Sequence, residues 1–338
     1  MIAGNSQETI LQTMAQSQLS LSTSPSALDG AVGEQVCVAW ESLAEQLTPL
    51  LLHPKSNPDF LKEITQLALA LINLVACDPD VAIFQIVNPT KTALLNYGVE
   101  HSIHTAILMS LIAKHKEWTP VQTANAVCAA LTMNISITQL QTDLARQPEP
   151  PTPEQKRDIV EHPSRSRDIL IDLGVMQIEW LRAVHEHHEQ HNGSGYPQGI
   201  RTVSPLSDAL RTSDMFCAKL SERASRTRLL STRAAQEIFR QNSYGYFGAT
   251  IVRILGMYPP GCLVRLLSGC IGIVLQRSTD PMRPRVALLT HDNGEPRETP
   301  IYSTTGVGPG SGIMGAVANN ELAQRFAIGE LYSLIPNQ

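Results

Sequence analysis

The chain has 338 residues, of which 43% are hydrophobic, and it carries a net charge of −5. This length allows two or three domains of roughly 100–200 residues each, and the hydrophobic content is typical of a globular protein with a buried core. The acidic balance and the lack of a long basic run argue against a nucleic-acid polymer as the partner.

Three further features of the sequence indicate a cytoplasmic protein. The six cysteines are scattered without a CxxC pair, so we expect reduced, buried thiols and neither disulfides nor a zinc site. The N-terminus lacks the basic stretch and the following apolar stretch of a signal peptide. The longest apolar run, residues 67–77, is too short to cross a bilayer, so no membrane span is expected.

The N-terminal third of the chain predicts helices. Residues 1–33 are rich in Ser, Gln and Thr, which is typical of a flexible or weakly helical tail. Apolar residues repeat at helical spacing over 34–52 and again over about 59–76, and Asp78-Pro79-Asp80 starts a short third segment. We interpret residues 34–92 as a helical module for packing or dimerisation, with a sensory role as the alternative.

The next block, residues 93–245, is helical throughout. The expected helices are, in chain order, 93–115, 120–132, 136–145, 153–160, 163–173, 177–190, 205–224 and 232–241. This sustained helical periodicity predicts an all-α domain built as a helical bundle.

The pattern changes in residues 246–338, which we interpret as a C-terminal extension. Short segments rich in Val, Ile and Leu, separated by turn residues, lie at 262–267, 271–276 and 285–290. They predict a small antiparallel meander. The glycine-rich residues 303–318 predict a loop, in which 306–315 lack the spacing of a phosphate-binding fingerprint, and 319–334 predict a terminal helix.

Candidate metal ligands are concentrated in the helical block, above all in HEHHEQHNGSGYP, residues 185–197. His101 and His104 lie on one side of their helix, His162 is expected to begin a helix before Pro163, His187 and His188 to end another, and Asp214 to lie on a further one. Imidazoles and carboxylates on facing helices commonly hold Fe, Mn or Zn. A lone histidine near a helix end is more often a cap, but this cluster favours a metal site.

The turn after the histidines has its own signature. Gly193 and Gly195 allow tight curvature and close approach of a ligand. Tyr196 can stack or form a hydrogen bond, and Pro197 fixes the exit of the chain. We expect these four residues to form a turn that faces a ligand or a partner.

The segment HHEQHNGSGYPQGI resembles the signature of the HD-GYP family, the metal-dependent phosphodiesterases of bacterial cyclic-di-GMP signalling. Four other segments resemble the family's elements in the same order: HSIHTAILMSLIA (101–113), EHPSRSRDIL (161–170), DMFCAKLSERASR (214–226) and YPPGCLVRLLSGCIGIVLQ (258–276). The resemblance covers roughly residues 93–290. It implies an HD-domain helical bundle with metal ligands at His101, His162, His187, His188 and Asp214.

The sequence departs from the family where the catalytic HD pair should lie. Met133 and Asn134 occupy these positions, Ile137 that of the family's lysine, and Tyr97 that of an acidic residue. Met is a poor ligand for a hard or borderline metal, and Asn cannot supply a bridging negative charge. The family's chemistry needs a water activated between two metals. The resemblance therefore assigns no catalytic residue and implies one divalent metal (Fe, Mn or Zn) or none.

Three functions stay open at this point. The first is a degenerate HD-GYP protein that binds cyclic di-GMP or a protein partner with little or no hydrolysis. For this reading the resemblance implies diguanylate cyclase domains as partners through the GYP turn, and the helical module allows a homodimer. The second is an active phosphodiesterase with a rearranged metal site that uses Glu100, His104 or His185. The third is a purely structural interaction module.

Overall fold

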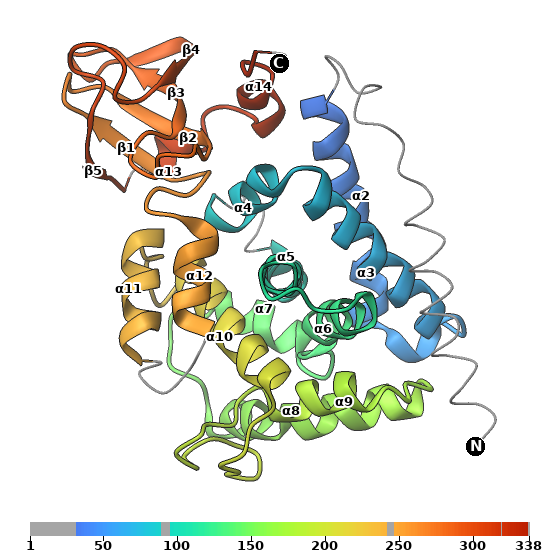
Figure 1. Cartoon of the computed structure of the whole chain (residues 1–338). Helices are drawn as coiled ribbons and strands as arrows, with labels where there is room; N and C mark the ends of the chain where they lie inside the picture. The colour runs from blue at the N-terminus through green and yellow to red at the C-terminus, as the bar shows by residue number, and fades with distance from the viewer. Residues whose placement is uncertain (1–31, 89–94, 242–246, 319, 337–338) are drawn as a thin grey trace.

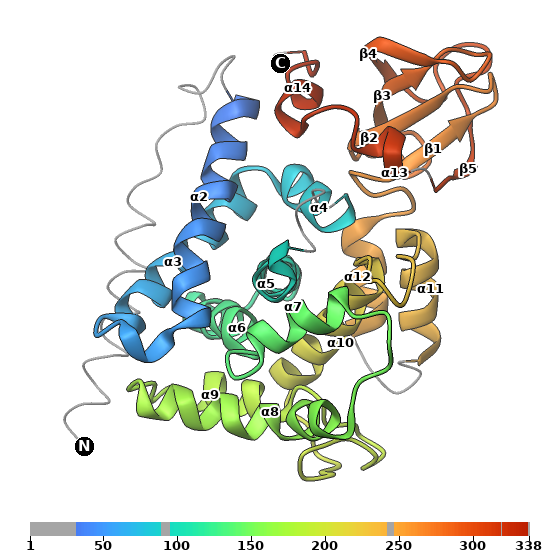
Figure 2. The same ribbon diagram turned by 180° about the vertical axis from the view of Figure 1, so that it is seen from behind.

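The computed structural model describes residues 32–88, 95–241, 247–318 and 320–336. All but the last two residues of the predicted tail, 1–33, lie outside these ranges. Figure 1 shows a helical body that carries a small sheet at one end, and Figure 2 shows the same arrangement from behind. The predicted all-α bundle, with helices before it and a small antiparallel sheet after it, is confirmed.

The helical body surrounds one central helix. Its elements are α2 (Val32–Leu52), η2 (Pro54–Ser56), α3 (Phe60–Cys77), α4 (Pro79–Val87), α5 (Tyr97–His115), α6 (Pro120–Thr132), α7 (Thr138–Arg146), α8 (Pro153–Asp172), α9 (Ile178–Glu186), α10 (Pro205–Leu220), α11 (Ser231–Gln241) and α12 (Phe247–Leu255). Figure 1 shows α5 end-on at the centre, and α5 contacts α2, α3, α4, α6, α7, α10 and α12. Because neighbours cover α5 on several sides, its histidines at positions 101 and 104 are buried and not solvated.

Helix starts in this body follow local sequence signals. Thr119 and Thr152 each form a capping box, in which the threonine and a glutamine three residues later satisfy each other's backbone N–H groups. A proline follows each threonine at the first helical position, where its missing N–H costs nothing. Asp78 caps α4 by accepting hydrogen bonds from the N–H groups of Asp80 and Val81.

One helix differs from its prediction in a way that matters for the site. The predicted helices 153–160 and 163–173 form one continuous helix, α8, with Pro163 inside it. His162 therefore lies in the middle of a helix, and the prediction that it begins one is wrong. The break was predicted because proline removes an N–H and crowds the carbonyl four residues earlier. The helix continues, and this carbonyl, that of Ile159, accepts a hydrogen bond from Nδ1 of His162 in place of the missing N–H.

The C-terminal sheet is larger than predicted. It contains β1 (Leu263–Leu266), β2 (Ile271–Gln276), β3 (Arg285–Thr290), β4 (Pro296–Thr304) and β5 (Ile313–Ala316), in the antiparallel order β4-β3-β2-β1-β5. The predicted meander corresponds to β1, β2 and β3. The predicted loop 303–318 contains β5, which pairs with β1 through Val264 and Ala316. The predicted terminal helix 319–334 is two short helices, α13 (Asn320–Ala323) and α14 (Ile328–Tyr332), because Ala327 has extended backbone.

Specific contacts fasten the sheet to the helical body. The carboxylate of Asp80 on α4 accepts hydrogen bonds from the backbone N–H and from Nε of Arg277, which directly follows β2. The hydroxyl of Tyr332 on α14 donates to the carbonyl of Leu275 at 2.9 Å, and its ring meets that of Phe84 on α4 edge to face. One hydrophobic core therefore continues from α2 into the sheet.

Two other predictions concern apolar and sulfur-containing residues. Among the described residues, α3 is long and apolar enough to cross a membrane by length and composition, and the structure buries eight of its residues in the core. Core packing therefore accounts for that composition. Of the described cysteine side chains, all are free thiols, Cys77 is exposed, and the other four are buried. The exposed thiol of Cys77 is an exception to the prediction.

Candidate metal centre

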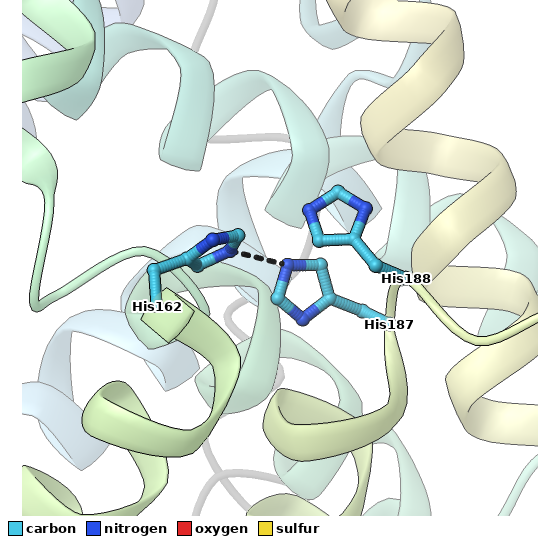
Figure 3. A group of neighbouring side chains, drawn as sticks. All are labelled: His162, His187 and His188. Carbon is cyan, nitrogen blue, oxygen red and sulfur yellow. Dashed lines mark hydrogen bonds between the residues drawn. The ribbon is translucent and has the colours of Figure 1, made fainter. Parts of the chain in front are cut away.

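Three histidines, one from α8 and two from the turn directly after α9, meet at the centre of the candidate site (Figure 3). His162 lies in the middle of α8, His187 directly follows α9, and His188 comes next along the chain. One ring nitrogen from each lies within 4.8 Å of those from the other two. Fe, Mn and Zn all accept imidazole ligands, so the cluster brings three suitable donors to one point.

Pro163 determines the orientation of His162. A proline inside a helix has no N–H, so the carbonyl four residues before it lacks its helical partner. That carbonyl belongs to Ile159, and it lies 2.6 Å from Nδ1 of His162. Because a carbonyl can only accept, the proton of His162 lies on Nδ1, which leaves a free lone pair on Nε2.

The end of α9 orients His187 in the same way. The last four carbonyls of a helix have no backbone partner within it, and α9 ends at Glu186. The carbonyl of Val184, in this last turn, accepts a hydrogen bond from Nδ1 of His187 at 2.7 Å. His187 therefore also carries its proton on Nδ1 and presents an unprotonated Nε2. Metal-binding histidines commonly have their other nitrogen anchored like this.

The two unprotonated nitrogens face each other. Nε2 of His162 and Nε2 of His187 lie 3.1 Å apart, along the dashed line in Figure 3. With both protons on the Nδ1 atoms, two lone pairs oppose each other unless a cation binds between them. Two nitrogens bound to one zinc ion at about 2.0–2.1 Å are separated by roughly 2.9–3.4 Å. The observed spacing therefore fits a shared metal.

Burial keeps these imidazoles neutral. Burial, and after it the charge of His187, lowers the pKa of His162 to about 3. Burial also lowers the pKa of His187, and burial with the charge of His187 lowers that of His188 well below its usual value. Because a metal binds the neutral imidazole, these three side chains are in the binding form at neutral pH.

His101 and Asp214 lie beside this group as a bonded pair. Nε2 of His101 on α5 is 2.7 Å from a carboxylate oxygen of Asp214 on α10. Burial alone would raise the pKa of Asp214, but the hydrogen bond and the charge of His101 hold it well below its usual value. The charge of Asp214 also acts on His187 and His188. All five predicted ligands therefore gather in one region, and their role as metal ligands stays a prediction.

Tyr97 fills one side of His101. The two rings stack with centroids 5.6 Å apart and planes at 7°. Nη2 of Arg223 donates to the Tyr97 hydroxyl at 2.6 Å, and the guanidinium carbon lies 5.0 Å from the centre of that ring. Where the family pattern has an acid, this chain therefore has an aromatic ring that braces His101 and is itself held by an arginine.

A buried glutamate closes the turn that follows the histidines. The carboxylate of Glu189 accepts hydrogen bonds from the backbone N–H groups of residues 198–200, at 2.6, 3.1 and 3.0 Å. Gly195 passes so close to this segment that a Cβ on it would overlap Cα of Glu189. Gly193 has a φ of 79°, in the left-handed region that favours glycine. Both predicted glycines are therefore required by the backbone path.

The turn also positions an aromatic ring over the histidines. Tyr196 stacks on His188, with centroids 4.6 Å apart and planes at 22°, and its ring centre lies 6.5 Å from that of His162. Pro197 follows directly. Gly193, Gly195, Tyr196 and Pro197 are thus placed beside the candidate site, and their predicted contact with a ligand or a partner stays a prediction.

Sequence reasoning missed the structural role of two glutamates, Glu189 and Glu186. Glu186, the last residue of α9, accepts hydrogen bonds from Nε of Arg182, from the hydroxyl of Ser207 and from the N–H of Ser204. It thereby ties α9 to the start of α10, the helix that carries Asp214. Their role could have been inferred from the sequence, because a carboxylate in a segment that is predicted to be buried needs hydrogen-bond donors.

The positions of the family's HD pair lie next to the site. Met133 and Asn134 stand where α6 ends, and both are buried. The nearby hydroxyl of Ser136 donates to the carbonyl of His162 at 3.2 Å, so this segment packs against α8. Ile137 is also buried. The segment contributes neither an imidazole nor a carboxylate to the neighbourhood of His162.

The alternative ligands lie in two places, with Glu100 and His104 on α5 and His185 on α9. On α5, a carboxylate oxygen of Glu100 lies 3.7 Å from Nε2 of His104, and burial with the charge of His101 lowers the pKa of His104 to about 3. Burial raises the pKa of Glu100. The pKa of His185 is lowered by burial and responds to charges on α8. Glu100 and His104 are therefore the alternatives nearest to His101.

Comparisons with known proteins find similarity in both sequence and fold. The family model described as HD domain matches residues 84–251. The chain is 27% identical over 197 residues to the cyclic di-GMP phosphodiesterase PA4108 of Pseudomonas aeruginosa, in a match that covers 56% of this chain and 47% of that protein. The chain therefore spans about half the length of this relative.

A solved structure shares the fold. Bd1817, described as a HDG"Y"P protein from Bdellovibrio bacteriovorus, superposes with a TM-score of 0.56 at 16% identity, over 75% of this chain and 79% of that chain. The matched HD domain, the related phosphodiesterase and the shared fold lead to one conclusion. Together they support the assignment of this chain, with its HD domain at residues 84–251, to the HD-GYP family.

Proposed function

We propose that this protein is a degenerate HD-GYP protein that binds cyclic di-GMP, or a protein partner, at a one-metal centre with little or no hydrolysis. The observation that carries the proposal is the pair of unprotonated Nε2 atoms of His162 and His187, 3.1 Å apart. Cyclic di-GMP is proposed because a related protein carries the name of a cyclic di-GMP phosphodiesterase.

The residues present suit one divalent ion. His162, His187 and His188 offer neutral nitrogens, and Asp214 adjoins them as a buried carboxylate held in its charged form. When bound, the ion would supply a positive charge that anchors a phosphate oxygen. Asp214 keeps the net charge of such a site low, and His101 holds Asp214 in place.

The loss of hydrolysis is inferred from the segment beside α8. Hydrolysis of a phosphodiester by a two-metal site needs a bridging ligand and a water between the metals. Met133 and Asn134 supply no charge, and Ile137 supplies no cation. Each missing electrostatic contribution costs roughly 3–4 kcal/mol, a few hundredfold in rate, so several together predict turnover near zero.

An active enzyme with a rearranged site is the second candidate. It is favoured by the pair of the partly buried Glu100 and the buried His104, which lies close to His101 on α5. In that case these two side chains would take the place of the missing pair, and a second ion would bind next to His101.

The remaining expectations are also proposals. The turn at Tyr196 and Pro197 would contact diguanylate cyclase domains, and the helices α2 and α3 would support a homodimer. A cytoplasmic location stays a prediction from the sequence.

Metal analysis of the purified protein tests the proposal directly. We expect at most one equivalent of Fe, Mn or Zn, binding of cyclic di-GMP in calorimetry, and no linear dinucleotide or mononucleotide product with added Mn or Fe. Two equivalents and clear turnover would establish the second candidate. No metal and no heat of binding would leave a purely structural module.

Restoring the missing pair tests how complete the rest of the site is. We expect the double variant Met133→His and Asn134→Asp to raise the metal content to two equivalents, because the neighbouring ligands are in place. The matched control, His115→Ala on the exposed end of α5, should leave the metal content unchanged. A double variant that folds but still holds one equivalent would mean that the second half of the site is lost beyond these positions.

A further inference from the structure

A cleft separate from the histidines lies between the helical body and the sheet. It has a volume of about 660 Å³ and lies between the end of α12 and strands β2 and β3. It shares no residue with the candidate metal centre. Its lining includes three arginines, Arg253, Arg277 and Arg285, but only one carboxylate, Asp80.

The one carboxylate of this lining is already engaged. Asp80 accepts hydrogen bonds from Nε and from the backbone N–H of Arg277, at 2.5 and 3.1 Å. Nη1 of Arg277 also donates to the carbonyl of Ile254 at 2.5 Å. Asp80 and Arg277 therefore form a neutral, fixed pair at the wall of the cleft, and the positive charge of the other two arginines is not balanced there.

Arg253 and Arg285 lack an acidic partner. Neither forms an ion pair with a carboxylate among the residues that the structure describes. Nη1 of Arg285 donates to the side-chain carbonyl of Gln276 at 3.1 Å, which holds the guanidinium without neutralising it. The cleft therefore holds two guanidinium charges that no carboxylate of its lining neutralises.

The other polar groups of the lining add donors. Tyr258, Gln276 and Thr279, whose side chains can donate hydrogen bonds, line the same cleft. The planar fork of an arginine matches the oxygens of a phosphate better than any other side chain does. The volume falls within the range of about 300–1,000 Å³ that is typical of small-molecule sites.

We propose that this cleft is a binding site for a small phosphate-bearing anion, with Arg253 and Arg285 as its principal contacts and Arg277 as a fixed wall. An anion held there would contact α12 and both strands at once. It would therefore strengthen the attachment of the sheet to the helical body. This site is independent of the proposed function at the histidines.

Calorimetry on the full chain in EDTA tests the proposal, because the chelator removes any metal from the histidines. The probes are inorganic pyrophosphate and GTP, titrated at low salt. We expect binding of at least one probe, weakened about tenfold or more by Arg253→Gln and by Arg285→Gln, since each removes a charged hydrogen-bond donor. Tighter binding of GTP would indicate a nucleotide, and equal binding a phosphate group alone.

Two controls separate this site from general charge and from the metal centre. Arg265→Gln removes one exposed charge from the same sheet outside the cleft, and His187→Ala alters the metal centre; both should bind the probes as the unaltered chain does. Equal weakening by Arg265→Gln would show non-specific attraction and overturn the proposal. So would the absence of binding to either probe, or full binding by both cleft variants with native thermal stability.

Discussion

Nε2 of His162 and Nε2 of His187 face each other at 3.1 Å, and each ring has its Nδ1 anchored on a carbonyl of its own helix. Two features of the backbone produce this relationship: a proline inside α8 and the end of α9. The rings are therefore oriented for a metal before any metal binds. Sites that are arranged in advance lose less free energy to ordering on binding.

Metal affinity should depend on His187. We expect His187→Ala to lower the affinity for Zn or Mn at least about tenfold, because it removes one of three converging nitrogens. The exposed His115→Ala serves as the matched control and should have no effect. Competition with a chromophoric chelator measures both affinities. Equal affinities for the two variants would show that the ion, if any, is held elsewhere.

The hydrogen bonds of Glu189 should be important for stability. We expect Glu189→Gln to lower the free energy of unfolding by about 1.5–3 kcal/mol, because the variant loses charged hydrogen bonds to three backbone N–H groups. Glu161→Gln breaks only a half-exposed ion pair with Arg165 and should cost less than about 1 kcal/mol. Urea unfolding compares the two. Equal costs would mean that solvent replaces the hydrogen bonds of Glu189.

Gly195 should not tolerate a side chain. A methyl group there would overlap the backbone of Glu189 and Gln190, so Gly195→Ala must displace the turn. We expect a loss of about 1–3 kcal/mol in the free energy of unfolding. Gly315→Ala on β5, where a Cβ meets nothing within 4 Å, is the control and should be nearly neutral. A stable Gly195→Ala variant would show that the turn can move without cost.

Stability should fall in mild acid because of His104. Burial and the charge of His101 lower its pKa to about 3 in the folded chain, from 6.5 when unfolded. Between these values the unfolded chain binds more protons, so the stabilisation is complete above about pH 6.5 and decreases toward pH 3, by roughly 1.4 kcal/mol per pH unit for this group.

His104→Gln isolates this contribution. The variant should show a shallower loss of unfolding free energy between about pH 6.5 and pH 5 than the unaltered chain, in urea titrations at each pH. His162, whose pKa is also about 3, should retain its own share of the slope. Identical slopes with and without His104 would place its protonation outside the folding equilibrium.

The histidine cluster could be predicted from the sequence because its signal is local. His187, His188 and the glycine turn are neighbours in the chain, and histidines at this density are unusual in a core or on a solvated surface. The place of His162 could not be predicted. A proline normally interrupts a helix, and whether a side chain replaces the lost donor at Ile159 depends on a ring orientation that sequence spacing does not contain.

The missed strands have a different cause. β5 is short, and it becomes a strand only by pairing with β1, about fifty residues earlier in the chain. β4 contains two prolines and only one buried residue, so it lacks the alternation that marks a strand, yet it pairs with β3. Pairing with another strand decided both elements, whereas periodicity within one segment was enough for most of the helices.

Pro163 also implies a trade-off between helix stability and ligand orientation. Replacing it with alanine would return a backbone donor to the carbonyl of Ile159 and make α8 a stronger helix. Nδ1 of His162 would then share this carbonyl with a backbone N–H, and the hydrogen bond that orients the ring would weaken. Helix α8 is thus weakened at the residue next to a candidate metal ligand, and sequence changes that stabilise the helix there would make the orientation of that ligand less fixed.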